Sequence, residues 1–208
     1  ENQVLPPQER PVAAIDWSPE GRLIAAGYVD GPIRVWEPGQ GRSTLPFADS
    51  LDEIRFVSWH PRAERFTVTG IERTIAIWSP DGTLVAELRG HRHGVYEAAW
   101  NRIDGRLASV SQDRTLRIWE ETINAGELLA SVAWHPDGNQ LATGSESGAI
   151  QLWRPDGRPD RLLQGHQDRV SSVAWSDDGH WIASGGRDAT VRLWSAAGEP
   201  VSVFRRHT

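Results

Sequence analysis

The sequence of 208 residues contains no cysteine, no methionine and no lysine. Without cysteine the chain cannot form a disulfide, a thiol nucleophile or a thiolate metal site, and this fits a cytoplasmic protein. The absence of methionine, even at the first position, leads us to expect a piece of a longer protein. Arginine is used throughout in place of lysine, which is typical of GC-rich coding, so the composition favours a bacterial source.

Long apolar runs and an excess of positive charge are missing as well. No segment approaches the roughly 20 apolar residues that a membrane-spanning helix needs, and no secretory signal is visible. The formal net charge of −6 opposes broad binding to a nucleic-acid backbone. We therefore expect neither a membrane nor a nucleic acid as partner.

Tryptophan, by contrast, is abundant and regularly spaced. Ten of the eleven tryptophans form five pairs, and the members of each pair lie nineteen residues apart. The first members of successive pairs are 42, 41, 34 and 41 residues apart. A period of this length indicates one supersecondary unit that is stacked repeatedly. The pairs are Trp17 and Trp36, Trp59 and Trp78, Trp100 and Trp119, Trp134 and Trp153, and Trp175 and Trp194.

The last repeat predicts four short strands and no helix. Its β-branched and aromatic runs are expected to form strands at 170–175, 181–184, 190–194 and 201–204. Asp178-Gly179 predicts a tight turn between the first two strands. The chain is therefore expected to be all-β and to form one domain, 1–208, of four-stranded antiparallel units. The repeats span about 8–48, 49–89, 90–127, 128–164 and 165–206.

These residues resemble the WD-repeat family, whose fold is a β-propeller. The Trp-Asp pair that names the family is absent, and its places hold Trp36-Glu37, Trp78-Ser79, Trp119-Glu120, Trp153-Arg154 and Trp194-Ser195. Propellers of this family mostly close a ring of seven blades, sometimes six or eight, which removes exposed sheet edges. The five repeats are thus expected either to close by themselves or to belong to a larger ring.

Two repeats contain a set of side chains that looks like a hydrolase triad. The third repeat has His91, Ser109, Asp113 and Trp119, and the fifth has His166, Ser184, Asp188 and Trp194, at identical spacings of 18, 4 and 6. The resemblance implies a structural tetrad instead, in which Asp accepts from His and Ser links His to the indole. A structural hydrogen-bond network can recur on several blades, whereas a second catalytic nucleophile would serve no purpose. The Gly-x-Ser-x-Gly motif of serine hydrolases is also missing from the sequence.

The other repeats keep only fragments of this tetrad. Asp30 in the first repeat and Glu72 in the second occupy the position of the tetrad aspartate. The fourth repeat keeps Thr143 and Ser147 as its fragments. None of the three has histidine at the matching position. A metal site at His91 and His93 lacks a nearby third ligand, so we expect no metal and no cofactor.

The third repeat is seven residues short. Trp134 follows Trp119 by 15 residues, whereas Trp175 follows Trp153 by 22. Either this repeat is shortened in its outer strand, or a loop is missing from the sequence. The segment 120–126 does not read as a convincing loop, which favours the second explanation.

The resemblance also implies where a partner would bind. Three position classes of such propellers face the narrow top surface. We expect that face to bind a protein or peptide, because tyrosine and arginine dominate interaction hot spots. The residues that stand out there are Arg55, Ile71, Tyr96, Gln112, Arg169 and Arg187.

Three functional classes follow from these observations. The favoured one is a non-catalytic interaction scaffold, the recognition or sensor module of a larger regulatory or signalling protein. The ring could also close by self-association or by swapped blades. A propeller enzyme would need convergent acids, histidines or metal ligands at the axis, whereas the inner strands hold mostly Ala, Ser and Val. An engineered or truncated propeller fragment without an evolved ligand is the third alternative.

Overall fold

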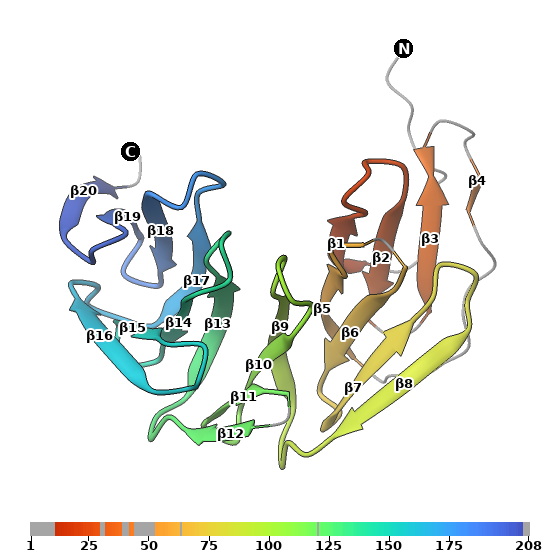
Figure 1. The fold of residues 1–208 in the computed structure, drawn as a ribbon, viewed down its shortest axis with the longest axis horizontal. Coiled ribbons are helices and arrows are strands. Elements are labelled where there is room, and N and C mark those ends of the chain that lie inside the picture. Colours follow the sequence, from red (N-terminus) through yellow and green to blue (C-terminus); the bar gives the residue numbers. More distant parts are fainter. Residues whose placement is uncertain are drawn as a thin grey trace. The chain divides into compact units, whose positions relative to one another are not determined.

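The computed structural model of the chain describes residues 11–29, 32–38, 42–43, 53–62, 64–119 and 121–205. These ranges contain no α-helix, and their strands form five antiparallel sheets of four strands each (Figure 1). Accordingly, none of the described segments could cross a lipid bilayer as a helix. The prediction of an all-β chain built from four-stranded antiparallel sheets is confirmed.

Each sheet takes its strands in chain order. Sheet 1 contains β1 to β4, at Val12–Trp17, Ile24–Tyr28, Ile33–Glu37 and Arg42–Ser43. Sheet 2 contains β5 to β8, at Ile54–Trp59, Phe66–Gly70, Thr74–Trp78 and Leu84–Arg89. Sheet 3 contains β9 to β12, at Val95–Trp100, Leu107–Ser111, Thr115–Ile118 and Glu121–Asn124. Sheet 4 contains β13 to β16, at Leu129–Trp134, Leu141–Ser145, Ala149–Trp153 and Pro159–Gln164. Sheet 5 contains β17 to β20, at Val170–Trp175, Trp181–Gly186, Thr190–Ser195 and Pro200–Arg205.

The chain divides into two compact units, Glu1–Ala98 and Ala99–Thr208, and the boundary falls within β9. Each unit is described by itself. The repeat limits predicted near residues 8, 48, 49 and 206 lie outside the described ranges.

In the first unit, sheets 1 and 2 pack against each other through apolar side chains. Ile33 and Val35 of β3 meet Ile54 and Val57 of β5 in one buried cluster, and each of these four side chains is at most 2% exposed. Trp59 belongs to the same cluster. Burying a side chain of this size contributes about 1.5–3 kcal/mol, so the contact is a major source of stability.

The second unit has a matching core between sheets 4 and 5. Ile150 and Leu152 of β15 pack against Val170 and Val173 of β17, together with the buried Trp194. The turns that precede the second strands are closed by backbone bonds, such as the bond of 2.9 Å from the Gly179 N–H to the Ser176 carbonyl. Apolar side chains of the third strand of one sheet and the first strand of the next therefore form an inter-sheet core in both units.

The hairpin between the third and fourth strands of the third repeat accounts for six of its seven missing residues. In sheet 5, Thr190 pairs with Arg205, fifteen residues later, whereas in sheet 3 Thr115 pairs with Asn124, only nine residues later. The hairpin between the third and fourth strands is therefore six residues shorter. Trp119 lies beyond the end of β11, in the tight connection to β12. Whether the repeat is shortened or a loop is missing from the sequence stays a prediction.

Candidate functional site

The four predicted tetrad residues of the fifth repeat form one continuous chain of hydrogen bonds. His166 Nδ1 lies 2.9 Å from Asp188 Oδ1, and His166 Nε2 lies 2.8 Å from Ser184 Oγ. Trp194 donates its indole N–H to Ser184 Oγ over 2.9 Å. Ser184 is 2% exposed and the side chain of His166 is 0% exposed, so the chain lies inside the sheet.

Only one arrangement of protons satisfies all four groups with a neutral imidazole. The indole can only donate and the carboxylate can only accept. Ser184 therefore accepts from Trp194 and donates to His166 Nε2, and His166 Nδ1–H donates to Asp188. The serine oxygen is buried and engaged on both sides, so it offers no nucleophile to a substrate. The geometry is that of a structural tie, because buried polar groups stabilise a fold when all of them are paired.

Asp188 is the anchor of this network. Its Oδ2 accepts from the Gln167 N–H over 3.0 Å, and its Oδ1 accepts from the Thr190 hydroxyl over 2.8 Å. Burial by itself would raise the pKa of Asp188, but the hydrogen bonds from Gln167, His166 and Thr190 outweigh it and hold the pKa well below the ordinary aspartate value. Asp188 is therefore held in its charged form.

The third repeat contains most of the same arrangement. Trp119 donates to Ser109 Oγ over 3.1 Å, and Ser109 is fully buried. Asp113 Oδ1 accepts from the Thr115 N–H over 3.0 Å, as Asp188 does from Thr190. His91 is buried in the first unit, whereas the other three residues lie in the second, so its link to them stays a prediction.

The fragments in the other repeats differ from one another. In the fourth repeat, Trp153 donates to Thr143 Oγ1 over 2.8 Å, so threonine takes the place of the tetrad serine. Ser147 Oγ lies 2.9 Å from Ser145 Oγ and closes the turn where aspartate stands in sheet 5. Glu72 is exposed in the second repeat. Asp30 lies outside the described residues.

Three of the predicted top-face residues gather in the first unit. The Arg55 guanidinium lies over the Tyr96 ring, 5.0 Å from its centroid, and Arg55 Nε lies 3.6 Å from Glu53 Oε1. Ile71 is 41% exposed, and its N–H donates to the Glu53 carbonyl over 3.1 Å. We call Glu53, Arg55, Ile71 and Tyr96 the Arg55–Tyr96 surface. It combines an exposed aliphatic group, an aromatic ring and two opposite charges.

The other three predicted top-face residues lie in the second unit. The Arg187 N–H donates to the Arg169 carbonyl over 2.8 Å, so these two arginines are neighbours at one end of sheet 5. The same bond links Glu146 to Leu128 in sheet 4, at 2.9 Å. Gln112 is exposed in the turn between β10 and β11. The structure therefore brings Arg169 and Arg187 together.

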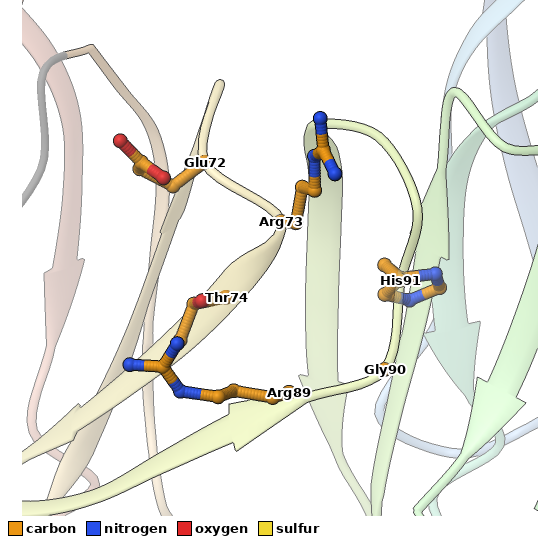
Figure 2. Close-up of a pocket in the computed structure, with 6 residues that line it drawn as sticks. All are labelled: Glu72, Arg73, Thr74, Arg89, Gly90 and His91. Atoms are coloured by element: carbon orange, nitrogen blue, oxygen red, sulfur yellow. The ribbon is translucent and has the colours of Figure 1, made fainter.

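A pocket of about 470 Å³ opens at the ends of β7 and β8 (Figure 2). Its charged groups do not converge, because the Arg73 and Arg89 guanidinium groups point in different directions. Arg89 donates to Glu87 Oε2 over 2.6 Å outside the pocket lining. The Glu72 carboxylate and the His91 ring lie on opposite sides of the pocket (Figure 2), so the pocket offers no paired acid and base. The lining residues are Glu72, Arg73, Thr74, Arg89, Gly90 and His91.

Sequence reasoning missed a set of polar ties between neighbouring sheets. Asn101 Nδ2 donates to the Gly138 carbonyl over 3.1 Å, and His135 Nε2 lies 3.1 Å from the Gly179 carbonyl. In both cases the residue after the first tryptophan of one repeat reaches the glycine in the first turn of the next. A polar residue follows the first tryptophan of every repeat, and this regularity could have indicated a shared role. Its hydrogen-bond partner could not be predicted, because the partner lies in the next repeat. No group of three or more histidine, aspartate or glutamate side chains in the described part of the chain is placed to hold a metal ion.

His60 gives the second repeat a dependence on pH. Burial lowers the pKa of His60, and the nearby Arg65 guanidinium lowers it further. The unfolded chain takes up this proton near pH 6.5 and the folded chain only at lower pH, so stability is expected to fall as the pH drops below about 6.5. His60→Gln should flatten that part of the profile, measured as urea midpoints at several pH values. His180→Gln, at an exposed turn, is the control, and an equal slope in His60→Gln and the native chain would contradict the explanation.

A sequence profile of the WD domain, G-beta repeat family matches residues 2–37, 82–120, 125–154 and 157–195, which is well over half of the chain. The chain belongs to the WD-repeat family. The match agrees with the pairing of Trp194 with Ser184 and of Trp119 with Ser109, which recurs from sheet to sheet. No matched segment covers 38–81, the part that holds the irregular turn after Trp59.

Several known WD-repeat relatives are eukaryotic proteins. Coronin-7 of Bos taurus is 30% identical over an alignment of 162 residues that covers 69% of this chain and 18% of coronin-7. Protein transport protein sec13 of Aspergillus fumigatus is 26% identical over 197 residues, covering 77% of this chain and 62% of the relative. Protein HIR1 of Cryptococcus neoformans is 28% identical over 189 residues, covering 70% and 21%. The chain thus spans less than two thirds of the length of each.

The WD-repeat dipeptide itself is altered in every pair, and the structure shows why this is tolerated. Glu37 and Ser195 end the third strands of sheets 1 and 5, where both are partly exposed. Trp36 and Trp194, in contrast, are each 2% exposed. The buried indole carries the packing of the repeat, and the residue after it can vary.

Proposed function

We propose that this WD-repeat chain is a non-catalytic scaffold that binds a protein or peptide, as the recognition or sensor module of a larger regulatory or signalling protein in the cytoplasm. The observation that carries the proposal is the Arg55–Tyr96 surface. Stacking on Tyr96 and the ion pair with Glu53 hold the Arg55 guanidinium in place before a ligand arrives. Such preorganisation lowers the entropy lost on binding.

The chemistry of this surface suits a peptide. Tyr96 and Ile71 offer an aromatic ring and an aliphatic side chain, while Arg55 and Glu53 offer a donor and an acceptor for backbone or side-chain groups. The buried hydroxyls of Ser109 and Ser184 support a non-catalytic role, because each accepts from an indole and neither is presented to solvent.

The finer features of this function belong to the same proposal. All five four-stranded sheets count as WD repeats, including sheet 2, most of which lies outside the matched segments. The expectation of a bacterial source rests on the lysine-free composition, while the relatives named above are eukaryotic. The proposed partners include a second copy of the chain, but they include neither a membrane nor a nucleic acid.

Selection from a displayed peptide library tests the Arg55–Tyr96 surface. The native chain is expected to enrich peptides that share a motif. Tyr96→Ala should weaken their binding by about 2 kcal/mol, roughly thirtyfold, because it removes both the ring and the support of Arg55. Arg55→Glu should act in the same direction. The dissociation constants of enriched peptides, measured by calorimetry, provide the comparison.

Arg62→Glu is the matched control, because Arg62 is exposed in the turn at the other end of β5. It makes the same change of charge in the same sheet and should leave peptide binding unchanged. Selection without any enriched motif, or motifs that bind Tyr96→Ala and Arg55→Glu as tightly as the native chain, would refute the proposed surface.

A further inference from the structure

Arg55 is the extra residue of a β-bulge at the start of β5. The register of β5 on β6 shifts between Ile54 and Phe56, so Arg55 has no partner across the ladder. Bulges turn a side chain away from the regular alternation of a strand and occur next to binding sites. In sheets 1, 4 and 5 the same bulge carries a small residue, Ala13, Ala130 or Ser171. The long charged side chain therefore distinguishes the second repeat from these three.

The guanidinium group of Arg55 is held on two sides. Its Cζ lies 5.0 Å from the centroid of the Tyr96 ring, and Glu53 Oε1 lies 3.6 Å from its Nε. Within the described part of the chain, Nη1 and Nη2 of Arg55 donate no hydrogen bond. The side chain is 25% exposed, so this outer edge of the guanidinium group can meet a ligand.

This outer edge has the chemistry of a carboxylate site. The parallel N–H groups of a guanidinium match the two oxygens of a carboxylate, and such charge-assisted hydrogen bonds are stronger than neutral ones. The distance of 3.6 Å from Arg55 Nε to Glu53 Oε1 is longer than a hydrogen bond. Glu53 therefore steadies Arg55 without saturating its donors, and a carboxylate of a ligand can come closer.

Other charged groups suit this position less well. The face of Tyr96 that would attract a cation of a ligand is already covered by Arg55. A phosphate carries about two negative charges at neutral pH, and it would meet one guanidinium group with the Glu53 carboxylate beside it. The single charge of a carboxylate therefore fits better than the double charge of a phosphate.

An aliphatic side chain lies next to the carboxylate site. The Ile71 N–H donates to the Glu53 carbonyl over 3.1 Å, which fixes Ile71 beside Glu53. A Cβ on Gly94 would lie 3.1 Å from Ile71 Cα, so the backbone two residues before Tyr96 packs directly on Ile71. Ile71 is 41% exposed and offers apolar surface to a ligand.

We propose that the Arg55–Tyr96 surface recognises a peptide through an acidic side chain, aspartate or glutamate, whose carboxylate accepts from Arg55 Nη1 and Nη2. A neighbouring apolar side chain of the peptide packs on Ile71. The inference rests on the proposed peptide-binding function and adds the chemical class of the ligand. Tyr96 is a positioning residue here, because it acts by holding the guanidinium group of Arg55.

A double-mutant cycle between the chain and its ligand tests this assignment. A peptide enriched by the native chain is synthesised with its acidic residue and again with the matching amide, asparagine for aspartate or glutamine for glutamate. The native chain should bind the amide peptide about tenfold more weakly, because a charge-assisted hydrogen bond is lost. Arg55→Gln should bind both peptides with the same dissociation constant, measured by calorimetry, because the positive charge that distinguishes them is gone.

Arg62→Gln is the matched control and should prefer the acidic peptide as strongly as the native chain does. Arg55→Lys replaces Arg55→Gln if the latter does not fold by circular dichroism or binds too weakly to measure. It keeps the charge but not the paired N–H groups, so its preference should be smaller than that of the native chain, and an undiminished preference would contradict the role of Arg55.

Four results would overturn the inference while leaving peptide binding intact. These are enriched peptides without an acidic residue, equal binding of the acidic and amide peptides by the native chain, tighter binding when phosphoserine replaces the acidic residue, and a preference that survives in Arg55→Gln. Selection without any enriched motif would instead refute the proposed function, and the inference with it. The two failures are thus told apart by whether any peptide binds.

Discussion

Replacing Asp188 by alanine is expected to lower the free energy of unfolding by about 3 kcal/mol. The carboxylate accepts hydrogen bonds from the Gln167 N–H, from His166 Nδ1 and from the N–H and hydroxyl of Thr190. Removing the carboxylate leaves these donors with no acceptor. Water cannot easily replace it, because the Asp188 side chain is only 7% exposed. Urea unfolding followed by tryptophan fluorescence measures the loss.

Asp178→Ala provides the comparison in the same sheet. Asp178 also accepts from a serine hydroxyl and a backbone N–H, but its side chain is 60% exposed and water can replace it. We expect a cost below about 1 kcal/mol there. Equal losses in Asp178→Ala and Asp188→Ala would show that the buried tetrad contributes no more than a surface turn.

The dependence of the free energy of unfolding on acidic pH gives an independent test of Asp188. Because the pKa of Asp188 is lower in the folded chain than in the unfolded chain, its contribution is complete above about pH 4 and is lost as the pH falls further. Asp188→Asn cannot take up this proton. Its unfolding midpoint should therefore decline less steeply below pH 4 than that of the native chain.

The strand pattern could be predicted from the sequence because its signals are local. Each strand is a short apolar or β-branched run, and turns such as Asp178-Gly179 separate the runs. The predicted strand at 190–194 is observed as Thr190–Ser195. The hairpin after Trp119 was harder to predict, since its six lost residues change the length of a connection and leave the flanking strands in place.

The tetrad of the fifth repeat was accessible for a similar reason, since His166, Ser184, Asp188 and Trp194 stand at fixed offsets. The ties from Asn101 to Gly138 and from His135 to Gly179 were not, because each joins two repeats and depends on how one sheet stacks on the next. The stacking of Arg55 on Tyr96 also joins two repeats. Sequence reasoning named both residues but gave no reason to pair them.

Replacing Gly138 by alanine is expected to cost about 2–4 kcal/mol, through two separate effects. Gly138 has a φ of +75°, a region in which a Cβ costs about 1–2 kcal/mol. That Cβ would also lie 2.6 Å from Asn101 Oδ1, and displacing this fully buried amide would break its bond to the Gly138 carbonyl and leave polar groups unpaired. Thermal unfolding of the purified variant measures the sum.

Gly21→Ala separates the two effects, because Gly21 occupies the same turn position in the first repeat. Its φ is +68°, but a Cβ there would meet no described atom within 4 Å. Only the backbone cost of about 1–2 kcal/mol should remain. Gly179→Ala should follow Gly138→Ala, since its Cβ would lie 2.5 Å from His135 Nε2. If all three variants lost the same stability, the ties through Asn101 and His135 would contribute nothing beyond the conformation of the turn, and sheet stacking in the second unit would not depend on these two side chains.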